Sequence, residues 1–471
     1  MGGKYRYLLK NVGLLTLSSF ATKLLSFFLV PLYTSILSTA DYGTYDLFNT
    51  TISLLIPILT VDIQEAVLRF SLENRDKSSV LKVGLKYYAI SLAIVVAVTI
   101  ANCAIGLLDV FAHYSVEFIL MYALMSLGGV LSYYARGAEK VKDLSFSSVV
   151  SSLVSILCNI YFLVVLDAGL LGYFYASIIG SAVQCAYLLV STRPLTEHRL
   201  KRPDRQLDKD MVNYSSPMIA NAISWWINNA SDRYIVTWLC GVAANGVYAV
   251  SYKIPSIISV LQQIFGQAWT ISAVKDFDKD DKDGFYIKVY DLYNTALVLA
   301  CSLLIFLDKP LAKFLFANDF YSAWIYAPFL MISTVFSGMA AFVGGLFSAL
   351  KKSKSFAETS VASAAVNTIG NLVLVPILGP FGASISTAVG YFVMLVMRLR
   401  TITKDVELAV NYKRDFLSYG LLVLQALLLC FDGISSVFSW YQLLFVVIEF
   451  FLFRKQIGSF VYKIKSTLTR D

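Results

Sequence analysis

Long apolar runs separated by short polar connectors make up almost the whole chain. A helix needs about 20 apolar residues to cross the hydrocarbon core of a membrane, and most of the runs reach that length. The runs lie near 12–37, 42–70, 81–107, 114–135, 145–166, 170–192, 212–238, 245–273, 286–307, 321–350, 356–378, 381–399, 416–432 and 434–453. The pattern predicts an all-α polytopic membrane protein with about 14 transmembrane helices.

The two halves of the chain show a weak internal similarity. Gly-Leu-Leu-Gly at 169–172 matches Gly-Pro-Phe-Gly at 379–382, and Gly180 matches Gly390 at the same offset of 210 positions. The shared order favours a duplicated six-helix unit whose copies have the same orientation, as in some transporters. The predicted organisation is an N-lobe with helices 1–6 at 1–192, a cytoplasmic basic linker at 193–211, a C-lobe with helices 7–12 at 212–403, and helices 13–14 with a cytoplasmic tail at 404–471.

The composition supports this assignment. Of 471 residues, 57% are hydrophobic and 15% are charged, and the mean hydropathy is +0.67. Soluble domains contain about 25% charged residues, so this composition excludes an ordinary water-soluble enzyme. The high apolar and aromatic content also excludes a disordered chain.

The positive charges indicate the orientation in the membrane. When the predicted loops are numbered alternately from inside, nearly all Lys and Arg residues lie in inside loops, and only Lys309 and Lys313 lie outside. This distribution predicts that both termini are cytoplasmic. The net charge of +8 is therefore an orientation signal. A nucleic-acid footprint would gather the basic residues on one domain, and no nucleic-acid partner is expected.

No pattern of an enzyme or a metal site stands out. The six cysteines form no CxxC pair, and the two histidines, His113 and His198, lie far apart. There is no Walker A motif, so we expect no ATP hydrolysis. Given the positions of the cysteines and histidines, we also expect no metal site, and we expect no catalytic residue and no cofactor. A membrane glycan polymerase or ligase is the enzyme alternative, but the longest predicted external connector, 308–320, has only four charged residues.

Three cations interrupt the apolar runs. Lys23 lies near the middle of the first run, whereas Arg233 and Lys253 lie near the outer ends of the seventh and eighth runs, at depths of about 8 Å and 12 Å. A charge at the bilayer centre costs about 2.5–3.5 kcal/mol on insertion scales, so each cation is a candidate functional residue. Cations at graded depths suit an anionic, amphipathic substrate. The alternatives are snorkelling of the lysines and structural pairing of Arg233.

Several acids lie near these cations in the sequence. Glu65 and Arg69 are four residues apart, which favours an ion pair on one helix face, with Asp62 one turn earlier. Together with Asp46, these residues are candidates for coupling or gating. Asp232 adjoins Arg233, but adjacent helical positions point about 100° apart and need not pair.

Buried amides complete the set of candidates. Asn367 and Asn371 lie one turn apart in the eleventh run. Polar side chains in such positions either hold helices together or line a cavity. With Asp232, they are candidate substrate-binding residues.

Three passages carry a family resemblance: NVGLLTLSSFATKLLSFFLVPLYTSILSTADYGTYDL from residue 11, SDRYIVTWLCGVAANGVYAVSYKIP from residue 231, and VNTIGNLVLVPILGPFGASISTAVGY from residue 366. The chain resembles the Wzx-type polysaccharide flippases of the multidrug/oligosaccharidyl-lipid/polysaccharide exporter superfamily. The resemblance covers nearly the whole chain. Asp232, Arg233, Lys253, Asn367 and Asn371 fall on the family pattern; Lys23 is inferred from depth alone.

This resemblance implies two six-helix lobes in a V, as in the multidrug exporters, with two additional helices. It implies alternating access that moves an undecaprenyl-pyrophosphate-linked oligosaccharide, such as an O-antigen unit of lipopolysaccharide or a capsule unit, to the outer leaflet of a bacterial cytoplasmic membrane. A glycan polymerase and chain-length machinery are the implied partners. A flippase for the peptidoglycan lipid precursor and a cation/drug antiporter remain open.

Overall fold

The fold is built of helices. The computed structural model describes residues 27–73, 76–192, 205–275, 284–350, 352–406, 408–431 and 440–458. Every regular element in these ranges is helical, and no strand occurs in them, which confirms the predicted all-α fold. Nine helices of the described chain are long and apolar enough to cross a membrane, or ten if one bent pair counts as one span. The chain is a multi-pass membrane protein, and the total of fourteen helices stays a prediction.

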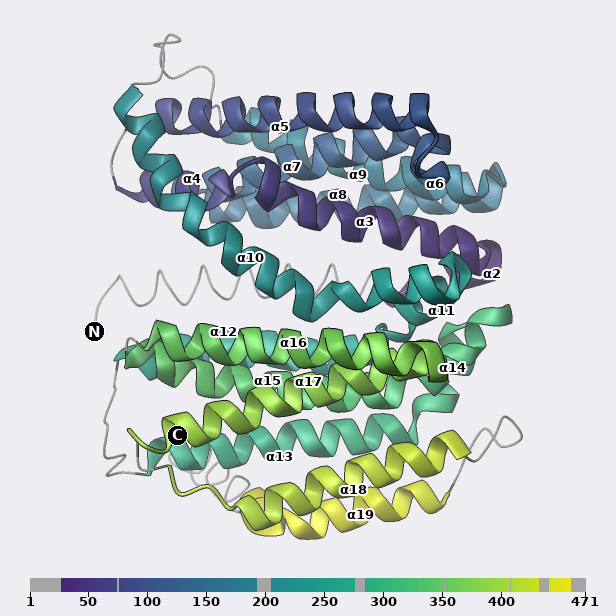
Figure 1. Ribbon diagram of the computed structural model, residues 1–471, viewed down its shortest axis with the longest axis vertical. Coiled ribbons are helices and arrows are strands. Elements are labelled where there is room, and N and C mark those ends of the chain that lie inside the picture. The colour runs from purple at the N-terminus through teal and green to yellow at the C-terminus, as the bar shows by residue number, and fades with distance from the viewer. Residues whose placement is uncertain are drawn as a thin grey trace, which may run out of the picture. The chain divides into compact units, whose positions relative to one another are not determined.

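The chain divides into two compact units, Met1–Trp226 and Ile227–Asp471. Unit 1 contains α2 (Val30–Ile36), α3 (Thr39–Leu59), α4 (Ile63–Leu72), α5 (Lys77–Ile105), α6 (Asp109–His113), α7 (Ser115–Gly137), α8 (Val141–Ile160), the π-helix η1 (Tyr161–Val165), α9 (Gly169–Thr192) and the first part of α10 (Arg205–Cys240). Unit 2 contains the rest of α10, α11 (Val242–Ser251), α12 (Pro255–Lys275), α13 (Phe285–Phe306), α14 (Asp308–Leu315), the 3-10 helix η2 (Asn318–Ile325), α15 (Ala327–Ala349), α16 (Ser353–Leu378), α17 (Pro380–Ile402), α18 (Tyr412–Phe431) and α19 (Tyr441–Leu452). Within each unit the long helices run side by side (Figure 1).

Local chemistry sets several helix ends. Ser38 and Asp41 form a capping box at the start of α3, in which each side chain accepts from the backbone N–H of the other residue. The Asp76 carboxylate caps α5 by accepting from the Ser78 N–H. Gly106 ends α5 in the left-handed conformation, with φ of 70°.

Each unit has its own buried core. In unit 1, Val67, Val83 and Leu131 of α4, α5 and α7 pack with Met211 of α10. In unit 2, α15 lies at the centre: 83% of its apolar window is buried, and it packs against α12, α13, α16, α17 and α18. A helix that is apolar all round and buried all round fits the middle of a bundle.

Two expected helices are broken. The run at 42–70 forms α3 and α4, which meet at a bend of 60°, and Val61 and Asp62 there have left-handed φ values of 57° and 48°. The run at 245–273 forms α11 and α12, with Lys253 in the break. Pro255 explains the second break, because proline disfavours helical geometry at the residue before it. Broken helices often form the binding sites of transporters.

The predicted external connector at 308–320 is not an open loop. Residues 308–315 form α14, and η2 follows it. Asp308 and Lys309 are 0% and 1% exposed, and the Lys309 Nζ lies 4.7 Å from the centre of the Trp324 ring. Burial raises the pKa of the Asp308 carboxyl well above its usual range. These charges are therefore part of the packed structure of unit 2.

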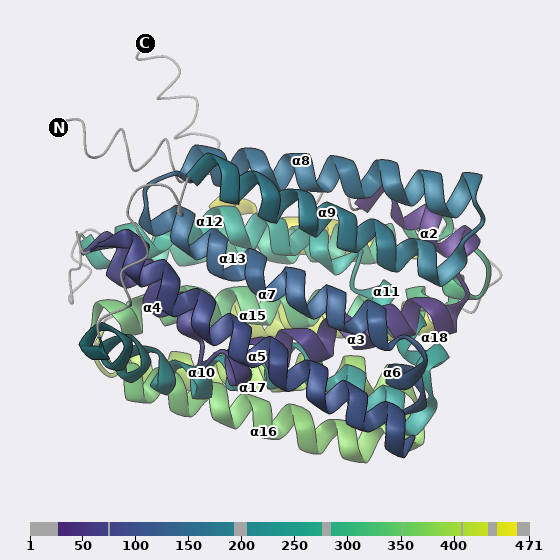
Figure 2. The ribbon, with the colours of Figure 1, turned by 90° about the horizontal axis from the view of Figure 1, so that it is seen from above.

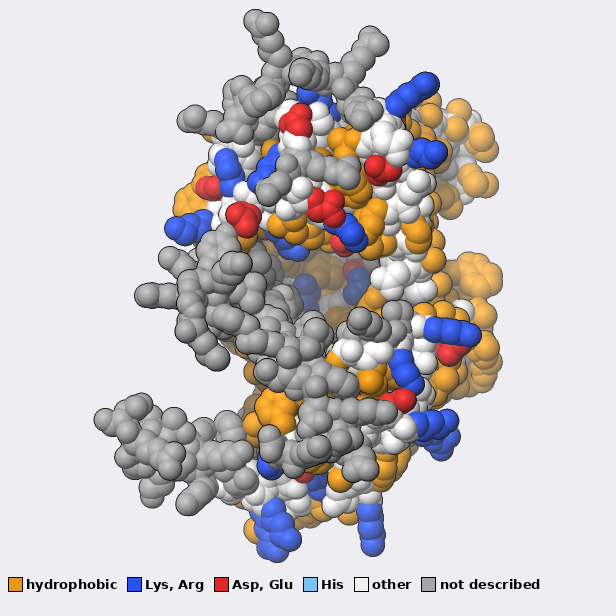
Figure 3. Space-filling view, turned by 90° about the vertical axis from the view of Figure 1, so that its left-hand side faces the viewer, with side chains coloured by type: hydrophobic (Ala, Val, Ile, Leu, Met, Phe, Trp, Pro, Cys, Tyr) orange, Lys and Arg blue, Asp and Glu red, His pale blue; other side chains and the backbone are white. Residues whose placement is uncertain are grey.

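The charged surface lies at the helix ends. The view in Figure 3 shows Lys, Arg, Asp and Glu side chains gathered on one end face, with hydrophobic side chains along the flank. Two ion pairs join neighbouring segments of a unit: Lys86 of α5 with Asp208 near the start of α10 at 2.7 Å in unit 1, and Lys352 with Asp405 at 2.6 Å in unit 2. This distribution is expected when the flank faces lipid and the ends face water. Which end is cytoplasmic stays a prediction.

The two matching glycines have equivalent surroundings. In unit 1, α8 and α9 run side by side (Figure 2), and the Ser151 hydroxyl donates to the Gly180 carbonyl oxygen at 2.8 Å. In unit 2, α16 and α17 make the same contact, from Ser363 to Gly390 at 2.9 Å. Small residues allow helix backbones to approach this closely. The glycine correspondence therefore reflects a shared helix crossing.

Gly382 provides a test of this close packing. A Cβ at Gly382 would lie 2.4 Å from the Leu374 carbonyl oxygen, which is backbone, whereas a Cβ at Gly420 would meet nothing within 4 Å. We expect Gly382→Ala to lower the free energy of unfolding by about 1–3 kcal/mol, measured by thermal unfolding in detergent. Gly420→Ala is the control and should be neutral or stabilising. Equal stability of the two variants would contradict the close crossing.

Candidate functional site

A buried carboxylate in unit 2 collects several of the predicted site residues. Asp232 of α10 is 3% exposed. Its Oδ2 accepts from the hydroxyls of Tyr248 at 2.7 Å and Tyr252 at 2.6 Å, and from Thr387 at 3.4 Å. Among the described residues no ion pair joins Asp232 to Arg233; hydroxyl groups of α11, α17 and the turn after α11 satisfy the carboxylate instead.

The two predicted asparagines belong to the same network. The Asn367 amide donates to the Thr387 hydroxyl at 3.1 Å, and the Asn371 amide donates to the Asn367 oxygen at 2.9 Å. Both asparagines are buried, at 3% and 0% exposed. The structure therefore brings Asp232, Asn367 and Asn371 together and ties α10, α16 and α17 to one another.

The two described cations of the site lie beside this network. The Arg233 guanidinium lies over the Tyr252 ring, 5.1 Å from its centre. Lys253 follows Tyr252 in the break between α11 and α12, and its backbone N–H donates to the Val250 carbonyl oxygen. Both side chains are half-buried. Within the described ranges, no hydrogen bond or ion pair holds the Lys253 ammonium group.

Unit 1 contains the other four candidates, but they do not form one cluster. Asp62 lies in the break between α3 and α4, is 6% exposed, and accepts from the Gln64 amide at 3.3 Å. Asp46 lies about 20 Å further along α3. The predicted Glu65–Arg69 pair is wrong: Arg69 pairs with Glu73 at 3.2 Å and lies over the Tyr214 ring. Glu65 and Glu73 each lie four residues from Arg69, so the sequence spacing allows either pair, and the side-chain rotamer of Arg69 determines which one forms.

Lys23, the third predicted cation, lies outside the described residues.

Sequence reasoning missed Thr387 and Tyr391, because a single hydroxyl in an apolar helix carries no distinctive signal. Tyr391 donates to the Asn229 oxygen at 2.8 Å. A further charged residue, Arg398, lies near the end of α17 and is 2% exposed.

Arg398 extends the unit 2 network toward the end of α17. Its guanidinium donates to the Ala340 carbonyl oxygen at 2.7 Å and to the hydroxyls of Thr359 at 3.2 Å and Ser360 at 2.9 Å. The Ser360 carbonyl oxygen accepts from the Asn228 amide at 3.2 Å. A buried arginine thus binds neutral acceptors on α15 and α16.

The network also offers oxygen ligands. In the described ranges, no group of three or more His, Cys, Asp or Glu residues is placed to hold a metal ion. The Asp232 carboxylate, the Thr387 hydroxyl and the amide oxygens of Asn367 and Asn371 are nevertheless of the hard type that Na⁺-like or alkaline-earth cations prefer. The Asn371 Oδ1 is buried without a hydrogen-bond partner.

The sequence matches a known family. Residues 8–270 match the family model described as polysaccharide biosynthesis protein. The probable low-salt glycan biosynthesis flippase Agl15 of Haloferax volcanii is 20% identical over 249 residues, which is 52% of each chain. The chain thus spans about half the length of this curated relative.

Solved structures of transporters share the fold. The lipid II flippase MurJ in an inward closed conformation gives a TM-score of 0.68 at 12% identity, covering 96% of this chain and 99% of that one. An inward-facing multidrug resistance MATE transporter gives 0.62 at 15% identity, covering 84% and 96%. A MOP superfamily transporter from Pyrococcus furiosus gives 0.58 at 14% identity, covering 85% and 96%. These likenesses show that the chain has the fold of these transporters.

Thr387 provides a test of the Asp232 network. Thr387→Val removes the hydroxyl that lies between Asp232 and Asn367, and the buried Asn367 amide loses this acceptor. We expect a loss of about 1–3 kcal/mol in the free energy of unfolding, measured by thermal unfolding. Thr401→Val, on the same helix, removes a hydroxyl that bonds only within its own helix, and should change stability by less. A Thr387→Val protein as stable as the control would refute the role of this hydroxyl.

Proposed function

The chain belongs to the polysaccharide biosynthesis protein family, and on that premise we propose that it is a flippase for a lipid-linked glycan. The proposed substrate is an undecaprenyl-pyrophosphate-linked oligosaccharide repeat unit of the O-antigen or capsule type. The named flippase functions of Agl15 and MurJ support the class of substrate, and the family resemblance of the three sequence passages supports the finer assignment.

The half-buried pair Arg233 and Lys253 carries the proposal. The hydroxyls of Tyr248 and Tyr252 donate to the Asp232 carboxylate, and two positively charged side chains, Arg233 of α10 and Lys253 at the break of α11 and α12, are half-buried beside it. Arginine and lysine bind phosphate by charge and by several donors. A diphosphate would therefore bind Arg233 and Lys253, with Lys23 as a third cation, while Asp232, Asn367 and Asn371 hold the helices that position them.

The proposed cycle is alternating access without ATP hydrolysis. Moving one elementary charge across 100 mV is worth about 2.3 kcal/mol, so a diphosphate anion that leaves a negative cell interior moves with the field. Asp46, Asp62, Glu65 and Arg69 are proposed to act in coupling or gating. The break at Asp62 supports such a role, because helix breaks absorb the backbone changes of a switching transporter.

The proposed location is a bacterial cytoplasmic membrane with both termini cytoplasmic. The excess of Lys and Arg in alternate connectors supports this orientation. The proposed partners are the glycan polymerase and the chain-length machinery, because a flipped repeat unit is the substrate of a polymerisation step on the outer face.

A peptidoglycan lipid-precursor flippase is the second candidate. The observation that favours it is the likeness to MurJ over nearly the full length of both chains. Both substrates are diphosphate lipids, so the cations at Arg233 and Lys253 serve either one. The lipid that accumulates in a deletion strain distinguishes the two.

Alanine substitutions test the cations. Arg233→Ala and Lys253→Ala each remove a charge-assisted contact to diphosphate, so we expect surface glycan to fall by about 10–100-fold in a complemented deletion strain. The repeat-unit lipid should accumulate on the cytoplasmic leaflet, as measured by mass spectrometry of membrane lipids. Arg233→Lys should retain part of the activity, because it keeps the charge.

Lys354→Ala is the control, since this lysine is 91% exposed at the start of α16, and should export normally. Wild-type export by Arg233→Ala and Lys253→Ala at normal protein levels would refute the assignment. Accumulation of the peptidoglycan precursor in the deletion strain would instead favour the second candidate.

A further inference from the structure

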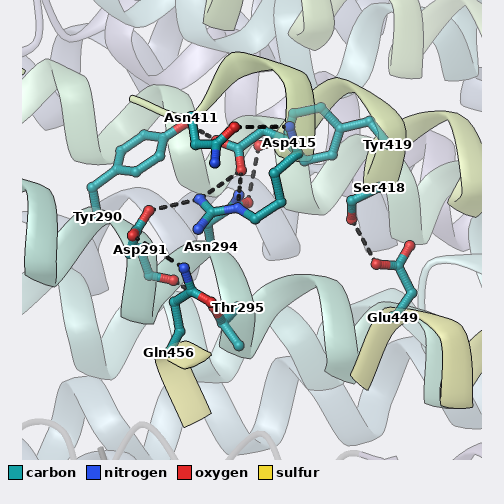
Figure 4. A network of polar contacts seen from close by, with 11 residues as sticks. Tyr290, Asp291, Asn294, Thr295, Asn411, Asp415, Ser418, Tyr419, Glu449 and Gln456 are labelled. Atoms are coloured by element: carbon teal, nitrogen blue, oxygen red, sulfur yellow. Dashed lines mark hydrogen bonds and ion pairs between the residues drawn. The ribbon is translucent and has the colours of Figure 1, made fainter. Parts of the chain in front are cut away.

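A buried polar seam joins the two additional helices, α18 and α19, to α13. We define the seam by its polar side chains, Tyr290, Asp291, Asn294, Ser302, Arg414, Asp415, Ser418, Tyr419, Gln425, Gln442 and Glu449. Figure 4 shows the part around Asp291, Asp415 and Glu449, where side chains of the three helices point toward one another. Sequence reasoning missed the seam, because its residues are spread over three apolar runs.

One end of the seam holds an arginine between two carboxylates. The Arg414 Nη2 donates to Asp291 at 2.6 Å and to Asp415 at 2.7 Å, and the guanidinium lies over the Phe453 ring. The Tyr290 hydroxyl also donates to Asp415, at 3.0 Å. Arg414 therefore already pairs with two acids.

The other end of the seam holds amides and hydroxyls. The Ser302 hydroxyl donates to the Gln425 oxygen at 2.8 Å, and the Gln425 amide donates back to the Ser302 carbonyl oxygen at 3.0 Å. The Gln442 amide donates to the Gln425 carbonyl oxygen at 3.3 Å. This end is neutral.

Glu449 lies between these ends and is 0% exposed. Its Oε2 accepts from the Ser418 hydroxyl at 2.8 Å, and its Oε1 is buried without a hydrogen-bond partner. Of the titratable groups on α13 and α18, the Cys301 thiol is within electrostatic reach of Glu449. The carboxylates of Asp291 and Asp415 belong to the charged end of the seam, where both pair with the Arg414 guanidinium.

The surroundings of Glu449 therefore stabilise its ionised form poorly. A buried carboxylate without a cation costs several kcal/mol, and one hydrogen bond does not offset that cost. With a proton on Oε2, the carboxyl group donates to the Ser418 oxygen across the same 2.8 Å contact, and Oε1 becomes a neutral carbonyl oxygen, which is cheaper to leave unpaired. We propose that Glu449 is a proton-binding site of the seam, which exchanges its proton when α18 and α19 separate from α13.

An adjacent face of α18, which shares Tyr419 with the seam, links this site to the rest of unit 2. Phe416, Tyr419 and Gly420 of α18 line an apolar pocket of about 440 Å³ together with residues of α15 and α17, including Phe336 and Phe392. Ser418, the partner of Glu449, lies next to Tyr419 on the same helix turn. The proposal goes beyond the flipping function and holds whichever lipid is carried.

Infrared spectroscopy of the purified full-length protein tests the proton directly. We expect the difference spectrum between acidic and alkaline buffer to contain a protonated-carboxyl band that Glu449→Gln removes. The control is Glu117→Gln, since Glu117 is 7% exposed in α7 and accepts from Tyr175 at 3.1 Å; this variant should keep the band. An unchanged band in Glu449→Gln would overturn the proposal.

Stability gives a second, independent readout. Glutamine mimics the neutral acid, so Glu449→Gln should unfold at the same temperature as the wild type or higher at neutral pH. A marked loss of stability would mean that the native group is charged, and would overturn the proposal even if the spectra could not be recorded.

Cys301 reports the separation of the helices. It is 0% exposed in α13, within electrostatic reach of Glu449. In a variant that keeps Cys301 and replaces the other five of the six cysteines, alkylation by a membrane-permeable maleimide should accelerate with pH at least tenfold more than in the same variant with Glu449→Gln. The glutamine variant corrects for titration of the thiol itself. Equal acceleration in both would refute exchange by helix separation.

Discussion

The bilayer interior offers no water, so every polar group placed there must find its partner within the protein. In this chain the constraint acts most strongly where helices break. At the bend between α3 and α4, the Asp62 N–H donates to the Pro57 carbonyl oxygen at 2.8 Å, and the Ile63 N–H donates to the Thr60 carbonyl oxygen at 3.2 Å. The backbone is thus satisfied locally, and the break at Asp62 can persist inside a membrane-spanning segment.

The same constraint explains how unit 2 treats its buried charges. Asp232 is held by hydroxyl donors and Arg398 by neutral acceptors, so within the described ranges neither charge uses an oppositely charged partner. Both arrangements join three or more helices, because the donors and acceptors come from α10, α11, α15, α16 and α17. In the seam, the buried charges at one end form an ion pair, whereas the Oε1 atom of Glu449 has no hydrogen-bond donor. Unit 2 is therefore held together by polar contacts as well as by its apolar core around α15.

The helical class and most spans were predictable from the sequence, because apolar runs of this length rarely form anything except membrane-spanning helices. The run at 245–273 was predicted as one helix, and its break at Lys253 was missed, although Pro255 offered a signal. The break at Val61 and Asp62 follows Pro57, which lies in the last turn of α3, but a β-branched residue rarely adopts a left-handed φ, so the sequence did not predict the break at Val61. The choice of Glu73 over Glu65 by Arg69, the hydroxyl donors of Asp232 and the seam depend on side chains from distant segments, and one sequence does not reveal such pairings.

In this fold, the exposure of acidic and basic side chains distinguishes a binding site for anions from a binding site for cations. A cation antiporter needs an acid that the substrate can reach, whereas the Asp232 carboxylate is 3% exposed and covered by two tyrosine hydroxyls. Two cations, Arg233 and Lys253, are half-buried beside it. The broken helix adds to this effect, because the start of α12 brings a helix N-terminus next to Lys253, and the dipole at that end favours anions. These features of unit 2 support the proposed diphosphate lipid substrate over a cationic drug.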